Sequence, residues 1–243
     1  MDTKASFAGL TEPYARWRSS RLGRITDRLE QALLADLLGP VSGRMLLDVG
    51  CGDGAMASRL ARQGALVAAL DSEATMIAAA RRRRESEATH YWLVTGRAET
   101  LPFADATFDC VIAVTVLCFV PDGAQTVREM ARVLKPGGRL VIGELGRFSL
   151  WAAWRRVRGW LGNPTWQIAT FRTARELRAL AQGAGLNVSD VRGAVHYPPW
   201  GAAAELLAPI DLWLGRRSTL GSAFIAMSAT RPAAADEAWP QPE

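Results

Sequence analysis

The sequence is poor in lysine, histidine and cysteine, and it has no long apolar run. Of its 29 basic residues only Lys4 and Lys135 are lysines, so arginine carries almost all of the net charge of +5. The three cysteines have no metal-ligand spacing, and we expect no metal site. The longest apolar run, 110–120, is too short to cross a bilayer. An odd cysteine count without a signal peptide predicts a soluble, cytoplasmic protein.

The chain of 243 residues is 49% apolar and 22% charged, which are ordinary values for one large globular domain. We expect this domain to span residues 1–230 and the tail 231–243 to be disordered. The basic residues cluster in 16–28, 81–84 and 147–178. Such clusters are typical of a solvated face, and an anionic substrate, RNA or an acidic membrane surface are the alternatives.

Short apolar runs alternate with helical patterns along most of the chain, which predicts an α/β fold with a mostly parallel sheet. The resulting expectation is a Rossmann-like sheet of seven strands with helices on both faces. The predicted strands are 44–49, 66–70, 91–95, 108–116, 139–144, 187–194 and 223–230. The predicted helices are 55–63, 72–84 with Ser72 as N-cap, 123–134, and 173–183 with Thr173 and Glu176 in capping-box spacing.

A glycine loop, 50–54, follows the first predicted strand and opens a helix, which is typical of nucleotide-binding sites. Asp48 precedes the loop and Asp53 lies inside it. Dinucleotide folds place a pyrophosphate at such a helix N-terminus, and acids there would repel it. The acids instead suit a cationic nucleoside such as S-adenosylmethionine. Asp71, which ends the second predicted strand, is placed to accept hydrogen bonds from ribose hydroxyls.

Four ordered segments resemble the class I S-adenosylmethionine-dependent methyltransferases, and most closely the branch that includes ubiquinone and menaquinone biosynthesis enzymes. The segments are 46–54 (LLDVGCGDG), 69–76 (ALDSEATM), 96–103 (GRAETLPF) and 129–140 (EMARVLKPGGRL). The resemblance implies the fold expected above, S-adenosylmethionine as cofactor and S-adenosylhomocysteine as product. It covers 44–145 strongly and 173–230 loosely.

The resemblance also implies roles for individual residues. Asp48, Gly50, Cys51 and Gly52 would surround the methionine part of the cofactor. Asp71 and Ser72 would hold the ribose. The remaining cofactor residues would be Met76, Ala98 and Glu99 at the adenine and Thr115 at the amino-acid moiety. Arg97 departs from the pattern, since the family often has an acid there that accepts from the adenine amino group. Arginine cannot accept a hydrogen bond, which leaves two alternatives: Glu99 substitutes for the acid, or the adenine amine faces water.

Three segments outside the strand–helix rhythm, 1–40, 147–170 and 197–217, are expected to form a cap over the cofactor. Their aromatic content predicts a small acceptor that is apolar, aromatic or lipid-like, with Tyr14, Trp17, Trp151 and Trp154 as binding residues. The mixture of tryptophan and arginine also fits peripheral contact with a membrane surface. For each tryptophan, the alternative is that it only joins the cap to the core.

His196 is the one histidine placed to reach an acceptor and is the candidate general base, with Glu144 as a weaker alternative. A structural, hydrogen-bonded histidine is the other interpretation. Methyl transfer is an in-line displacement that depends mainly on alignment, so the base is required only for some acceptors. The oligomeric state is left open.

Two other functions remain as alternatives. An RNA methyltransferase would fit the charge, but nucleic acid is an unlikely partner because the base-methylating motif Asn/Asp-Pro-Pro-Tyr is replaced by Thr115-Val116-Leu117-Cys118. A non-catalytic binding protein on the same fold is the second alternative, which the intact Asp48, Gly50 and Asp71 disfavour.

Overall fold

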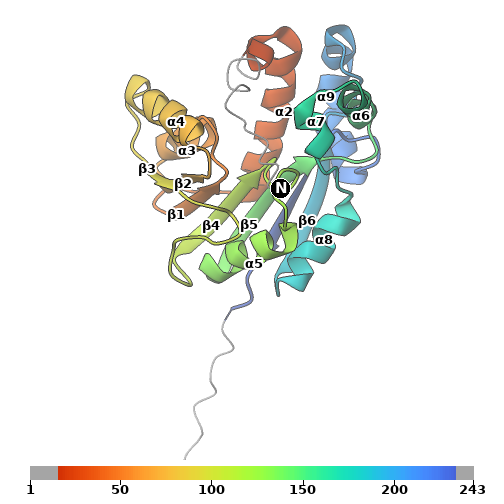
Figure 1. Cartoon of the computed structure of the whole chain (residues 1–243). Coiled ribbons are helices and arrows are strands. Elements are labelled where there is room, and N and C mark those ends of the chain that lie inside the picture. Colours follow the sequence, from red (N-terminus) through yellow and green to blue (C-terminus); the bar gives the residue numbers. More distant parts are fainter. Residues whose placement is uncertain (1–15, 234–243) are drawn as a thin grey trace, which may run out of the picture.

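The computed structural model describes residues 16–233, and Tyr14 and most of the predicted tail lie outside them. Its centre is a seven-stranded sheet with the order β3-β2-β1-β4-β5-β7-β6, in which only β7 is antiparallel to its neighbours (Figure 1). The strands are β1 (Met45–Val49), β2 (Leu66–Asp71), β3 (Trp92–Thr95), β4 (Phe108–Val114), β5 (Leu134–Leu145), β6 (Asn187–Ala194) and β7 (Phe224–Thr230). The predicted Rossmann-like fold is confirmed.

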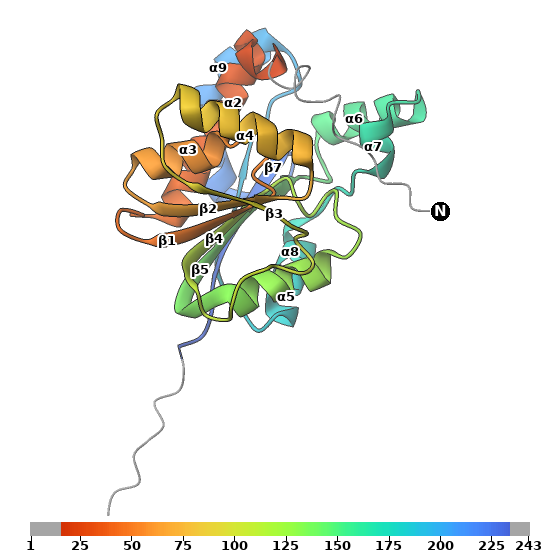
Figure 2. The ribbon, with the colours of Figure 1, turned by 60° about the vertical axis from the view of Figure 1, so that its left-hand side comes forward.

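Helices cover both faces of the sheet because successive residues of each buried strand point to opposite sides. Along β1, Leu46 belongs to a buried cluster that includes residues of α2, α3, α4 and α9, whereas Leu47 belongs to one that includes residues of α5 and α8. These two sets of helices lie on opposite faces of the sheet (Figure 2). The helices of the first face are α2 (Arg21–Leu38), α3 (Ala55–Arg62), α4 (Ala74–Ser86) and α9 (Gly201–Arg217). Those of the second face are α5 (Gly123–Val133) and α8 (Ala174–Gly183).

Two further helices, α6 (Leu150–Trp160) and α7 (Pro164–Ile168), lie apart from the sheet and form a projecting hairpin (Figure 2). Its inner side is anchored through Ala152 and Phe171, which pack with Cys118 and Leu145 at the ends of the central strands. At Gly159 the two helices touch closely, since a Cβ there would lie 3.0 Å from the Trp166 carbonyl oxygen. None of the helices between residues 16 and 233 is long and apolar enough to span a membrane.

The local predictions differ from the structure at a few helix and strand ends. Ser72 is not an N-cap: α4 begins at Ala74, and the Asp71 carboxylate accepts from the backbone N–H of Glu73 instead (2.9 Å). The capping box of Thr173 and Glu176 is present. β4 ends two residues early because Thr115 turns into the left-handed region, at a φ of 53°.

Candidate functional site

The three glycines after β1, Gly50, Gly52 and Gly54, have positive φ values but different surroundings. A Cβ on Gly50 would lie 2.5 Å from Cγ2 of Val116, and a Cβ on Gly54 would lie 2.6 Å from the Tyr91 hydroxyl. Around Gly52, at a φ of 54°, nothing lies within 4 Å of the position that a Cβ would take. The outer glycines therefore let the loop pack against protein, while the middle one leaves its backbone open to a ligand.

Asp48 supplies a buried acid directly under this loop. Its side chain is 2% exposed, and its Oδ2 atom has no hydrogen-bond partner among the described residues. Burial, reinforced by the negative charge of Asp71, raises the pKa of Asp48 to about 8. An unsatisfied buried carboxyl is costly, and a cationic ligand group would relieve that cost. This environment fits the ammonium group of S-adenosylmethionine.

Asp53 adds less negative charge to this site than the sequence predicts, and it is the smallest of the causes that raise the pKa of Asp48. Arg83 in α4 donates to its Oδ2 at 2.6 Å and to its carbonyl oxygen at 3.0 Å. The charge of Asp53 is thus neutralised within the protein. The acidity of the site comes from Asp48 and Asp71.

Asp71 ties the glycine loop to the end of β2. One of its oxygens accepts from the backbone N–H of Gly52 (2.9 Å) and the other from that of Glu73 (2.9 Å). A carboxylate has about four lone-pair sites, so two acceptor positions remain for ligand hydroxyls. Ser72 beside it is exposed, and Met76 lies half-buried on the first turn of α4.

The predicted adenine segment begins next to Asp71, because the N–H of Gly96 donates to the Asp71 carbonyl oxygen (3.1 Å). Ala98 follows as a buried residue. Arg97 is exposed and pairs with Glu99 at 3.0 Å. Glu99, the alternative acceptor for the adenine amine, is therefore already paired with Arg97, which stands where the family often has an acid.

The loop after β4 forms the other wall of the site and is held under strain. Thr115 is β-branched yet left-handed, a conformation that costs about 1–3 kcal/mol. Its N–H donates to the Gly143 carbonyl oxygen (2.7 Å), and the Leu117 N–H donates to Oε1 of buried Glu144 (2.7 Å). Burial raises the pKa of Glu144 to about 7. Glu144 therefore holds this loop against β5.

Cys51 lies inside the glycine loop with a buried side chain, and its N–H donates to the Leu70 carbonyl oxygen (2.9 Å). Burial and the nearby Asp48 raise the pKa of its thiol. It remains a neutral packing group rather than a nucleophile.

On the acceptor side, an aromatic cluster joins α2, α6 and the segment after β6. The rings of Trp17 and Trp151 meet edge to face at 6.2 Å. The Trp151 indole donates to the Tyr197 carbonyl oxygen (2.9 Å), and the Tyr197 hydroxyl lies 3.0 Å from Thr26 Oγ1. Trp151 is buried, so its contacts match the alternative that it joins these segments. Trp154 points outward and is half exposed.

The sequence interpretation missed Arg155 and Glu30. The Arg155 guanidinium lies 5.2 Å from the Trp151 ring centroid and 5.0 Å from that of Trp166. Glu30 is partly accessible but closely surrounded by protein. Desolvation raises its pKa to about 7, although the charge of Arg155 opposes the shift. No motif marks these residues, because they come from distant parts of the chain and only the tertiary structure brings Arg155 near enough to act on Glu30.

His196 is held by structural hydrogen bonds. Its Nε2 lies 2.8 Å from Ser222 Oγ, and the carboxylate of buried Asp211 accepts from the N–H groups of Val195 and His196, both at 2.7 Å. β6 is also four strands from β1, about 19 Å at the usual strand spacing. These contacts fit the alternative that His196 is a structural, hydrogen-bonded histidine, although its buried Nδ1 has no hydrogen-bond partner among the described residues.

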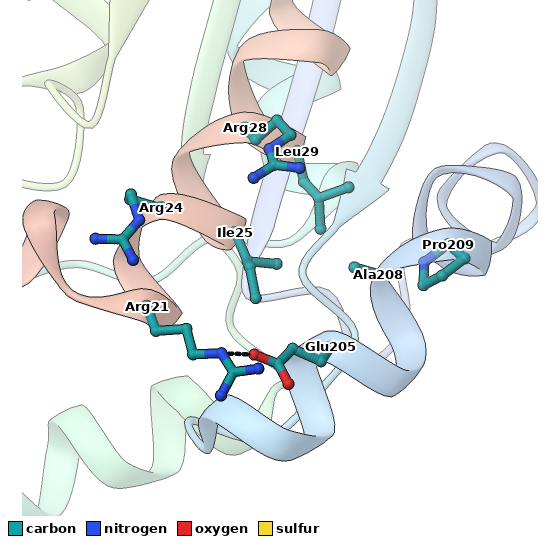
Figure 3. A pocket seen from close by; sticks show the side chains of 8 residues that line it. All are labelled: Arg21, Arg24, Ile25, Arg28, Leu29, Glu205, Ala208 and Pro209. Atoms are coloured by element: carbon teal, nitrogen blue, oxygen red, sulfur yellow. Dashed lines mark ion pairs between the residues drawn. The ribbon is translucent and has the colours of Figure 1, made fainter.

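A cavity of about 590 Å³ lies between α2 and α9, away from this site (Figure 3). Three arginines of α2 line it, and Arg21 pairs with Glu205 across it. Arg21 and Arg28 lie two helical turns apart on one face of α2. Glu30 follows Arg28 by two residues and therefore points to nearly the opposite side. The arginine-lined cavity is separate from the aromatic cluster.

Comparisons with known proteins agree with this geometry. Residues 47–142 match the family model described as a methyltransferase domain. A ubiquinone biosynthesis O-methyltransferase of Xylella fastidiosa is 37% identical over 180 residues, covering 71% of this chain and 72% of that protein. The chain belongs to the class I S-adenosylmethionine-dependent methyltransferases.

Solved structures share the fold. A possible histamine N-methyltransferase of Thermotoga maritima superposes with a TM-score of 0.71 at 23% identity, covering 93% of this chain and 97% of that one. Magnesium protoporphyrin IX methyltransferase of Synechocystis, solved with bound S-adenosylhomocysteine, has a TM-score of 0.67 at 17% identity, covering 93% and 96%. The enzyme is a methyltransferase whose cofactor is S-adenosylmethionine.

Proposed function

We propose that this enzyme methylates a hydroxyl group on a small apolar or aromatic acceptor, bound between α2 and α6 above the ends of β4 and β5. The observation that carries the proposal is the group of aromatic rings around Arg155: Trp17 contacts Trp151, and the Arg155 guanidinium lies over both Trp151 and Trp166. Glu30 is near enough for the charge of Arg155 to act on its carboxyl group. Flat apolar walls with a few polar groups are typical of small-molecule sites. The O-methyltransferase name of the Xylella fastidiosa relative supports oxygen as the acceptor atom.

When bound, S-adenosylmethionine supplies an electrophilic methyl group on a sulfonium. Asp48 would hold its ammonium group, Asp71 its ribose hydroxyls, and the open backbone of Gly52 would border its methionine part. Ser72, Met76, Ala98 and Glu99 would line the nucleoside side, and Thr115 would face the amino-acid moiety. The acceptor oxygen must approach the methyl carbon in line with the bond to sulfur.

Glu30 is the proposed general base, in place of His196. As the acceptor oxygen bonds to the methyl carbon and the carbon–sulfur electron pair returns to sulfur, the hydroxyl proton would pass to the Glu30 carboxylate. A pKa near 7 is close to the best value for such a base at neutral pH. Arg155 would orient an aromatic ring or an anionic substituent of the acceptor.

A substrate panel scored by S-adenosylhomocysteine release tests the acceptor class. Phenols and catechols with and without an apolar chain would be compared with amines, carboxylic acids and RNA. We expect turnover of the hydroxylated aromatic compounds, faster with the apolar chain. Turnover confined to amines or RNA would overturn the proposal.

A further inference from the structure

The exposed side of α6 is apolar, whereas an ordinary surface helix exposes its polar side. Its outward residues Leu150, Trp154, Val157 and Leu161 are 63%, 53%, 40% and 81% exposed. They are spaced by four, three and four residues, so they form one stripe along the helix. The helix buries Trp151 and Ala152 on its other side. We call this outward stripe, with Trp160 at its end, the α6 ridge.

Exposed apolar side chains lie at both ends of the α6 ridge. Trp160, at the tip of the hairpin, is 84% exposed. At the other end, the Gly221 N–H donates to the Phe148 carbonyl oxygen (3.0 Å), which brings exposed Leu220 beside exposed Phe148. Monomeric proteins rarely expose so many large apolar side chains in one place without a binding partner.

The charge around the ridge has one sign. Residues 145–175 contain six arginines and no aspartate or glutamate. Arg158 is exposed beside the ridge. Arg156 is half-buried: its guanidinium lies 4.9 Å from the ring centroid of buried Phe171 and donates to the Arg147 carbonyl oxygen (3.2 Å). Arg147 itself pairs with Glu176 at 2.8 Å. An apolar stripe beside an exposed arginine is complementary to a surface that is apolar inside and negative outside.

We propose that the α6 ridge docks the enzyme onto the surface of an anionic lipid bilayer. The helix would lie in the interface with Trp160 and Leu161 inserted among the acyl chains and Arg158 among the phosphates. Charge disfavours a second copy of this chain as the occupant, since two ridges facing each other would bring like-charged arginines together. The hairpin projects from the body, so it can reach a flat surface (Figure 2).

Docking there would place the inner side of the same helix over the acceptor site. Trp151 and Arg155 belong to the aromatic cluster, whereas Trp154 and Val157 belong to the ridge. An acceptor dissolved in the bilayer would then reach the cluster without crossing water. This consequence depends on the proposed acceptor, but the docking itself does not.

Vesicle co-sedimentation of the full chain tests the docking. The probes are vesicles of phosphatidylcholine alone and of phosphatidylcholine with phosphatidylglycerol. We expect binding to the anionic vesicles that weakens with salt, and about tenfold weaker binding for the double variant Trp160→Ser/Leu161→Ser. The charge reversal Arg158→Glu should weaken binding to anionic vesicles further than to neutral ones.

The matched control is Leu66→Ser/Trp92→Ser, which removes an equally large exposed pair at the β2–β3 edge of the sheet. It should bind vesicles as the natural protein does. All of these side chains are exposed, and circular dichroism and S-adenosylhomocysteine binding would verify the fold of each variant. Equal loss in the control, no binding by the natural protein, or a dimer in solution that Trp160→Ser/Leu161→Ser dissociates would each overturn the proposal.

Discussion

Around the glycine loop, the predicted cofactor-binding groups lie at the ends of strands, and strand pairing and backbone hydrogen bonds fix their positions. Gly52, Asp48 and Asp71 are fixed by the parallel pairing of β1 with β2 and by hydrogen bonds of 2.9 Å. Over the acceptor site, the groups are side chains of helices that meet only through packing, such as Trp17 on Trp151. We call the glycine loop with Asp48 and Asp71 the donor half of the site, and the aromatic cluster with Arg155 and Glu30 the acceptor half. The positions of the groups in the donor half are fixed because the sheet is rigid. The acceptor half can change its chemistry through a few substitutions in helices.

The largest effect is expected at Gly52. Gly52→Ala should weaken S-adenosylhomocysteine binding about a thousandfold, or about 4 kcal/mol, because the new Cβ fills the open space and the φ of 54° strains alanine. Calorimetry measures the change. Gly137→Ala is the matched control, since Gly137 also has a positive φ and open space but lies at the other end of the sheet. Similar losses in both variants would mean that strain alone is responsible.

The next largest effect is expected at Glu30, where a substitution should change catalysis in the acceptor half without changing cofactor binding in the donor half. Glu30→Gln should lower kcat/KM for the acceptor about a hundredfold and remove the rise in rate through pH 7, since the amide cannot take the proton. Affinity for S-adenosylhomocysteine should stay unchanged. Asp36→Asn, an exposed acid on the same helix, is the control. If the pH profile of Glu30→Gln matches that of the natural enzyme, Glu30 is not the base.

Asp48 links cofactor binding to pH. Its pKa of about 8 in the free enzyme means that it is neutral below that pH, while an ammonium group favours the anion. Affinity for S-adenosylhomocysteine should therefore fall as the pH drops below 8. Asp48→Asn should bind about tenfold more weakly at pH 8 and with a flatter pH dependence, as measured by calorimetry. Glu144→Gln, another buried acid, should keep the natural dependence.

The same substitution should stabilise the free enzyme. The folded pKa of Asp48 lies above the ordinary value of 3.8, so its contribution to stability is lost as the pH rises from 3.8 to 8. An amide avoids this penalty. Asp48→Asn should raise the free energy of unfolding at pH 8 by about 1–3 kcal/mol in urea titrations. A less stable variant would contradict the burial argument.

The smallest effect is expected at the adenine end of the donor half. Arg97→Asp would restore an acceptor and release Glu99 from its 3.0 Å ion pair. Affinity for S-adenosylhomocysteine should increase about two- to tenfold, the value of one hydrogen bond. Arg97→Ala releases Glu99 without adding an acceptor. Equal gains in both variants would show that freeing Glu99 is sufficient.

Much of the donor half was predictable because it depends on local patterns. The order of the strands and helices follows from apolar periodicity, and the glycine loop and Asp71 are recognisable by spacing along the chain. Local reasoning failed where a residue had competing partners. The N-cap of α4 is Glu73 rather than Ser72, with the N–H of Glu73 bonded to the Asp71 carboxylate, and Asp53 is paired with Arg83, which is 30 residues away.

The sequence by itself determined the sheet and the family and predicted where the cofactor binds, because strand patterns and the glycine loop are properties of short segments. Only the tertiary structure decided which titratable groups lie near the proposed acceptor site. Glu30 and Arg155 are 125 positions apart and have no sequence motif, and the burial that shifts the pKa of Glu30 exists only in the folded chain. The apolar stripe of α6 also faces outward only because of the way the α6–α7 hairpin packs on the rest of the protein.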